Sequence, residues 1–191
     1  MNRLAKTAAL VGTLSLAACV QTPAEKAQAD IATMQREATV DKLVERGKIF
    51  AAMGDGTRAE EYLTAALDAG AKPKEVLPVL LSVCVQNGKY RSAILHAEQH
   101  LRTHPDDAQT RFVLGTLHAA LGEAKEARVE LQRALEARPG EANAHYALAV
   151  LARDTENDVV SADRQFREYL RLAPNGEHAE EARASLLKEV P

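Results

Sequence analysis

Small and apolar residues recur along the middle of the chain at a fixed distance of 34 positions. In the two clearest segments a glycine is followed, at the same intervals, by an alanine, a leucine and a proline. The clearest segments contain Gly88, Ala93, Leu101 and Pro105, and then Gly122, Ala127, Leu135 and Pro139. Gly54, Ala59 and Leu67 stand one step earlier, and Ala162, Leu170 and Pro174 stand one step later, after one residue inserted between Thr155 and Ser161. A repeat of this length predicts stacked units rather than one undivided core.

Each repeat predicts two antiparallel helices joined by a short turn. The glycine suits the turn, and the proline ends the second helix because it cannot continue one. Small residues such as alanine let the two helices approach closely. We therefore divide the chain into four units, which cover residues 40–73, 74–107, 108–141 and 142–176.

These positions resemble the tetratricopeptide repeat, most clearly in the third unit. That unit has Leu114-Gly115 in its first helix, Gly122 at the turn, Ala127 and Ala134 in its second helix, and Pro139 at its end. The resemblance implies an all-α fold, a right-handed superhelical solenoid of about four helix-turn-helix repeats. It also implies that the first helices of the units line a concave face.

Units one and two depart from the repeat pattern. Arg46 stands where a leucine is usual, and Ala71 stands where the closing proline is usual. In unit two, Leu81 replaces the glycine of the first helix, and Pro78 lies inside that helix. Because proline is tolerated only in the first turn, we expect this helix to be bent or to begin late.

Stacked repeats leave an apolar face open at each end, so the last unit needs a cap. Residues 177–191 predict a capping helix with an apolar stripe that contains Ala179, Ala182, Leu186 and Leu187. At the other end, residues 19–39 are mostly polar. They predict a partly helical tether rather than a further core.

The first 18 residues have the pattern of a secretory signal peptide. Arg3 and Lys6 form a short positive region, and an apolar run follows from Ala8 to Ala18. This run is too short to span a bilayer, and such a segment is removed from the mature protein.

The segment Leu16-Ala17-Ala18-Cys19 resembles the bacterial lipobox. The resemblance implies cleavage before Cys19 and lipidation of that cysteine, with palmitate among the acyl chains. In such lipoproteins an aspartate at the next position retains the protein at the inner membrane, whereas this chain has Val20. The expected location is therefore the outer membrane, with the protein lipid-anchored and facing the periplasm. The alternative is an ordinary signal peptide in which Cys19 is incidental.

Composition agrees with a helical protein and excludes some functions. Hydrophobic residues make up 46% of the chain but aromatic residues only 4%, whereas a β-sandwich or barrel would need more strand-forming side chains. Lys and Arg number 24 against 27 Asp and Glu, which gives a net charge of −3. Without a basic excess to contact phosphates, we expect no nucleic-acid partner.

The candidate catalytic and metal-binding residues are few. His96, His100 and His104 are spaced to share one helix face, but no Cys or carboxylate motif beside them completes a zinc site. Cys84 is expected to be a small buried side chain. The sequence has no G-x-S-x-G, P-loop or G-x-G-x-x-G motif. We therefore predict no catalytic residues, no metal and no cofactor, and we expect no small-molecule substrate.

The concave face is the better candidate site, because the resemblance implies that partners lie there. Phe112 and Tyr146 are one repeat apart and are expected to stand side by side in an apolar trough with a cationic rim, a typical anchor for a peptide or helix. The other possibility is that they fill gaps between repeats. The residues expected to face inward are Val44, Lys48, Pro78, Ser82, Val85, Phe112, Thr116, Tyr146, Val150 and Arg153.

The sequence thus predicts a non-enzymatic scaffold that binds a protein partner in the bacterial envelope. Lipoproteins of this architecture resemble the pilotins of type IV pilus secretins and other envelope-assembly factors, which implies a role in guiding a secretin or pilus component. An alternative is an adaptor of peptidoglycan enzymes or of another envelope complex, acting through the convex face or a dimer. A third is a metal-dependent enzyme at the three histidines.

Overall fold

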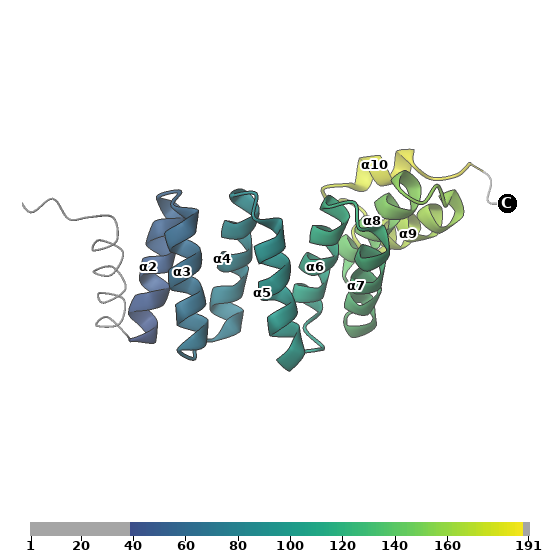
Figure 1. Cartoon of the computed structure of the whole chain (residues 1–191). Helices are drawn as coiled ribbons and strands as arrows, with labels where there is room; N and C mark the ends of the chain where they lie inside the picture. Colours follow the sequence, from purple (N-terminus) through teal and green to yellow (C-terminus); the bar gives the residue numbers. More distant parts are fainter. Residues whose placement is uncertain (1–38, 189–191) are drawn as a thin grey trace, which may run out of the picture. The chain divides into compact units, whose positions relative to one another are not determined.

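The structure is a computed structural model, and it describes residues 39–188 (Figure 1). The predicted signal peptide, Cys19 and all of the tether except its last residue lie outside the described residues. Within residues 39–188 the chain forms helices and no strands. The helices are α2 (Val40–Ala52), α3 (Gly56–Asp68), α4 (Pro73–Gln86), α5 (Tyr90–Thr103), α6 (Ala108–Ala120), α7 (Ala124–Ala137), α8 (Ala142–Asp154), α9 (Val159–Leu172) and α10 (Ala179–Ala184).

The eight longer helices pair as α2 with α3, α4 with α5, α6 with α7, and α8 with α9, and each contacts the next along the chain. Figure 1 shows α2 to α7 standing side by side, with the chain reversing direction between successive helices. Each pair coincides with one of the four units predicted from the 34-residue period, except that α4 begins one residue early, at Pro73. The predicted all-helical repeat architecture is confirmed.

The turns inside the units explain why glycine recurs. Gly54, Gly88 and Gly122 have φ of +74°, +69° and +75°, a left-handed conformation that costs glycine little because it has no Cβ. The fourth turn, between α8 and α9, is one residue longer than the others. There Asn157 takes the left-handed conformation with φ of +54°. Asparagine is one of the few other residues that tolerate it.

A pair of facing positions, one on each helix of a unit, combines a small residue with a large one. In unit three a Cβ on Gly115 would lie 2.7 Å from Cγ of Leu131. In unit one a Cβ on Gly47 would lie 2.6 Å from Cγ of Leu63. The glycines therefore create the space that the leucines fill.

The leucine that replaces glycine in unit two follows the same rule in reverse. The 34-residue spacing places Leu81 at the position of Gly115 and Ala97 at the position of Leu131, and both residues are buried. In unit four the pair is Ala149 and Phe166. The departure at Leu81 is thus balanced by a smaller partner, which conserves core volume.

The first helix of unit two does not begin late, contrary to one of the two expectations for it. α4 begins at Pro73, in the first turn where proline is favoured, and it continues through Pro78 to Gln86. Pro78 and Lys74 are both exposed. Pro78 has no N–H, so the Lys74 carbonyl lacks its usual helical donor. Because both residues are exposed, this carbonyl lies on the solvent-facing side of the helix.

The C-terminal segment covers the last repeat. α10 spans only six residues, so it is shorter than the predicted capping helix. Ala179 and Ala182 are buried in a cluster with Phe166 and Tyr169. The Asp163 carboxylate accepts the Leu187 backbone N–H at 2.9 Å, which ties the chain beyond α10 to α9. None of the described helices combines the length and apolarity that a membrane span requires.

Candidate functional site

A hollow of about 520 Å³ lies between α4 and α6, the first helices of units two and three. We call it the central hollow. Three of the residues predicted to face inward line it, namely Pro78, Ser82 and Val85. The other lining residues are Pro73, Lys74, Leu77, Leu81, Asp107, Gln109, Thr110, Val113 and Arg138.

The central hollow has an apolar floor and a charged margin. Leu77 and Leu81 are buried beneath it, and Val113 is half-buried. Lys74 and Arg138 are exposed. An apolar surface with cations beside it can accept apolar side chains of a ligand and hold its orientation through polar contacts.

A second hollow of about 520 Å³ lies between α2 and α4 and contains the unit-one residues of the prediction. We call it the first hollow. Val44 and Lys48 line it together with Val76 of α4. Five of the predicted inward-facing residues therefore line two hollows along successive first helices.

The unit-three residues of the prediction lie on α6 outside the lining of both hollows. Phe112 and Thr116 are half-buried. The Thr116 hydroxyl donates to the Val113 carbonyl at 2.8 Å, so its hydrogen is already bonded within its own helix. Their contact with a partner stays a prediction.

In unit four the predicted residues contact the chain's own C-terminal segment. The ring of Tyr146 stacks on His178 at 3.9 Å, and its hydroxyl donates to Glu181 at 2.6 Å. Burial, and then the bond to Glu181, raises the pKa of Tyr146 to about 12. Val150 packs on the same cluster.

Arg153, the last of the residues predicted to face inward, is also engaged by the C-terminal segment. It donates to Glu181 at 3.0 Å and to the Ser185 hydroxyl at 2.8 Å, and its guanidinium lies 5.4 Å from the ring centroid of Phe166. Tyr146, Val150 and Arg153 therefore hold the cap in place. Whether they also touch a partner stays a prediction.

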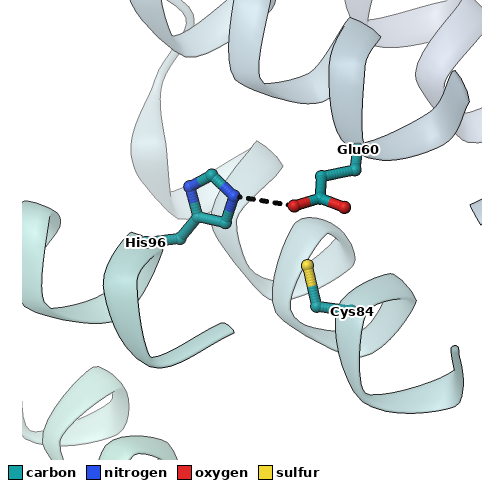
Figure 2. A group of neighbouring side chains, drawn as sticks. All are labelled: Glu60, Cys84 and His96. Atoms are coloured by element: carbon teal, nitrogen blue, oxygen red, sulfur yellow. Dashed lines mark hydrogen bonds and ion pairs between the residues drawn. The ribbon is translucent and has the colours of Figure 1, made fainter. Parts of the chain in front are cut away.

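Cys84 is fully buried, as expected, but its surroundings were not foreseen. Figure 2 shows its thiol beside Glu60 of α3 and His96 of α5. Burial, and then the charge of Glu60, raises the pKa of the Cys84 thiol to about 11. Glu60 also accepts from Lys89 at 2.9 Å. These residues come from three helices and form no sequence motif, so spacing could not reveal them.

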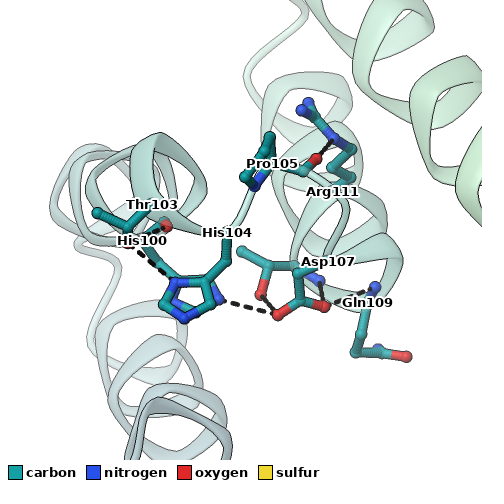
Figure 3. A network of polar contacts seen from close by, with 8 residues as sticks. His100, Thr103, His104, Pro105, Asp107, Gln109 and Arg111 are labelled. Atoms are coloured by element: carbon teal, nitrogen blue, oxygen red, sulfur yellow. Dashed lines mark hydrogen bonds and ion pairs between the residues drawn. The ribbon is translucent and has the colours of Figure 1, made fainter.

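The three histidines in α5 and at its C-cap do not converge on one site. His96 turns to Glu60, whereas the ring of His100 lies 2.9 Å from the Asp107 carboxylate and stacks on His104 at 4.4 Å (Figure 3). Asp107 in turn accepts the backbone N–H groups of the first turn of α6. His100 thus helps to fix the loop between units two and three, which is a structural role.

Comparison with known proteins supports the repeat fold. Residues 85–152 match the family model described as tetratricopeptide repeat. The chain has the tetratricopeptide-repeat fold. No curated protein sequence matches it.

Solved structures of tetratricopeptide-repeat proteins superimpose on the chain. YrrB, described as having an unusual peptide-binding site, is 20% identical with a TM-score of 0.62, and the match covers 83% of this chain and 88% of YrrB. MamA from Desulfovibrio magneticus RS-1 is 17% identical with a TM-score of 0.62, covering 78% and 87%. A repeat protein from Parabacteroides merdae is 23% identical with a TM-score of 0.67, covering 76% and 58%. At these identities the similarity shows the fold alone.

Proposed function

We propose that the chain is a non-enzymatic scaffold that binds an apolar peptide or helix of a partner protein in the central hollow. The observation that carries the proposal is the lining of this hollow. Buried leucines form its floor, and the half-buried Val85 and Val113 stand at its sides. Side chains from two successive first helices thus leave an apolar surface that can anchor the apolar side chains of a ligand.

Two further observations support this site. The first hollow continues the same row of first helices, so a ligand can extend from α4 to α2. YrrB, which shares the fold, is described as a peptide-binding protein of this class. By contrast, the cap engages the corresponding residues of unit four.

We place the scaffold at the periplasmic face of the outer membrane, held by lipid on Cys19. The support for this location is the lipobox-like segment that ends at Cys19, together with Val20 after it. More than one acyl chain makes such an anchor stable without a membrane-spanning helix. A pilotin-like role follows if the ligand is a segment of a secretin that is brought to this membrane.

An adaptor acting through the other face is the second candidate. Leu95 of α5 and Val129 of α7 are 56% and 44% exposed and stand one repeat apart on the second helices. Large apolar side chains at equivalent places in two units can form a second contact surface.

A substitution at one exposed position can distinguish between the two candidate binding surfaces. Ser82→Arg places a long charged side chain in the central hollow at a site that is exposed in the free protein, so the fold should be unaffected. Gln99→Arg introduces the same bulky cation at an exposed position of α5 and serves as the control. Both variants and the wild type are used to capture partners from detergent-solubilised envelopes, with identification by mass spectrometry.

We expect Ser82→Arg to reduce capture at least about tenfold and Gln99→Arg to leave it unchanged. A secretin among the proteins lost supports the pilotin-like role, and a peptidoglycan hydrolase or synthase supports the adaptor role. Equal capture by Ser82→Arg and wild type would exclude the central hollow. Loss of partner capture in a variant that combines Leu95→Arg and Val129→Arg would then assign binding to the second-helix face.

A further inference from the structure

Three potential metal ligands of different chemistry meet between units one and two. Cys84 of α4 supplies a thiol, His96 of α5 an imidazole nitrogen and Glu60 of α3 a carboxylate oxygen. One such atom from each residue lies within 4.8 Å of the other two (Figure 2). Among the described residues no other group of three or more such side chains brings its ligand atoms this close together.

The separations are close to those around a tetrahedral zinc ion. Zinc binds nitrogen and oxygen at about 2.0–2.2 Å and sulfur at about 2.3 Å, so neighbouring ligand atoms stand roughly 3.3–3.6 Å apart. The imidazole nitrogen Nε2 of His96 and Oε1 of Glu60 are 3.4 Å apart. This distance is long for a hydrogen bond but suits two ligands of one ion. The thiol lies within 4.8 Å of both atoms, so it needs to approach by about 1.2 Å at most.

The second carboxylate oxygen of Glu60 is held independently of this cluster. Lys89 Nζ binds Oε2 at 2.9 Å, which orients the carboxylate and leaves Oε1 facing His96. A ligating carboxylate with a fixed outer partner is a recurrent feature of metal sites. The ammonium of Lys89 remains paired, because the ion needs only one oxygen.

Solvent can reach the cluster from one side. Cys84 is 0% exposed, whereas the side chains of His96 and Glu60 are 14% and 19% exposed. An ion can therefore approach past Glu60 and His96, and a water molecule can occupy the fourth position from that side.

We propose that Glu60, Cys84 and His96 form a zinc site that joins α3, α4 and α5. The thiol loses its proton to solvent as the sulfur binds the ion. The charges of one thiolate and one carboxylate then neutralise Zn²⁺, which suits a partly buried location. Mixed sulfur, nitrogen and oxygen donors favour zinc over the hard cations magnesium and calcium. The proposal does not depend on the central hollow or on the bound partner.

Titration of the full chain with Zn²⁺ under reducing conditions tests the site. Cys19→Ala is the common background, because it removes the only other cysteine of the sequence. Calorimetry should give one zinc per chain. His96→Gln keeps a hydrogen-bonding side chain but should weaken zinc binding more than about tenfold. His104→Gln, at the exposed histidine that caps the C-terminus of α5, should bind as the background does.

Cobalt reports directly on the sulfur. Co²⁺ added to the background protein should give a thiolate charge-transfer band and the visible bands of tetrahedral coordination. Both should disappear in Cys84→Ala and fall strongly in His96→Gln, while circular dichroism of His96→Gln shows that its helices are retained. Binding without a charge-transfer band, unchanged affinity in His96→Gln, or no zinc bound at all would each overturn the proposal.

Discussion

The exchange of small and large residues between helices makes a quantitative prediction about unit three. Leu131→Ala removes a fully buried leucine and should destabilise the protein by about 2–5 kcal/mol. Gly115→Leu should cost at least about 1–3 kcal/mol, because even its Cβ would lie 2.7 Å from Leu131 Cγ. Combined, the two changes recreate the Leu81 and Ala97 arrangement of unit two.

The double variant should therefore be destabilised by less than the sum of the two single changes. The added leucine fills the space that Leu131→Ala vacates, so the double variant should lie within about 2 kcal/mol of wild type. A coupling of about 1–3 kcal/mol is characteristic of residues in direct contact. For a chain of this length each kcal/mol corresponds to about 2–4 °C in Tm.

Urea unfolding followed by circular dichroism measures all four proteins of the cycle. Gly140→Ala is the control for a glycine with open space around it and no positive φ, and it should be neutral or stabilise by about 0.4–1 kcal/mol. If the effects of Gly115→Leu and Leu131→Ala add within about 0.5 kcal/mol, the two positions do not share one volume. The explanation of Leu81 would then be refuted.

The remaining predictions concern the anchor and the cap. Cys19→Ala should release the protein from the outer-membrane fraction without changing its Tm, because the lipid supplies attachment and the repeats supply stability; co-sedimentation with membranes would contradict the lipobox interpretation. Bonds from Arg167 hold the pKa of Asp163 below its ordinary value of 3.8. A carboxyl group whose pKa is lowered in the folded state stabilises the protein at pH values above its unfolded-state pKa. This stabilisation is lost as the pH falls through the folded-state pKa. Tm should thus drop below about pH 4, and less so in Asp163→Asn.

The 34-residue period was enough to predict the fold. Ala59, Ala93 and Ala127 are all fully buried, as helix-packing positions require. The inserted residue near Asn157 also falls where the spacing placed it, in the loop between α8 and α9. Periodicity works here because each unit contacts mainly its neighbours, so local sequence determines most of the packing.

The site was less predictable, because it depends on residues outside the period. Tyr146 stands one repeat after Phe112, and the period alone predicts equal surroundings for the two. The C-terminal segment breaks this equivalence, since Glu181 and His178 engage Tyr146. The cluster around Cys84 was also hidden, because its members lie on three helices at separations unrelated to the repeat.

For the ligand proposed above, the contacts between α8 and the C-terminal segment limit the length of the available surface. The row of open first helices runs from α2 to α6. Packed helices lie about 8–10 Å apart, and successive first helices make fewer contacts than packed neighbours do, so two steps cover at least about 16–20 Å. An extended chain advances about 3.3 Å per residue and fills that distance with five or six residues, whereas a helix lying along it needs about 11–13. The ligand proposed for this face is therefore a short linear motif.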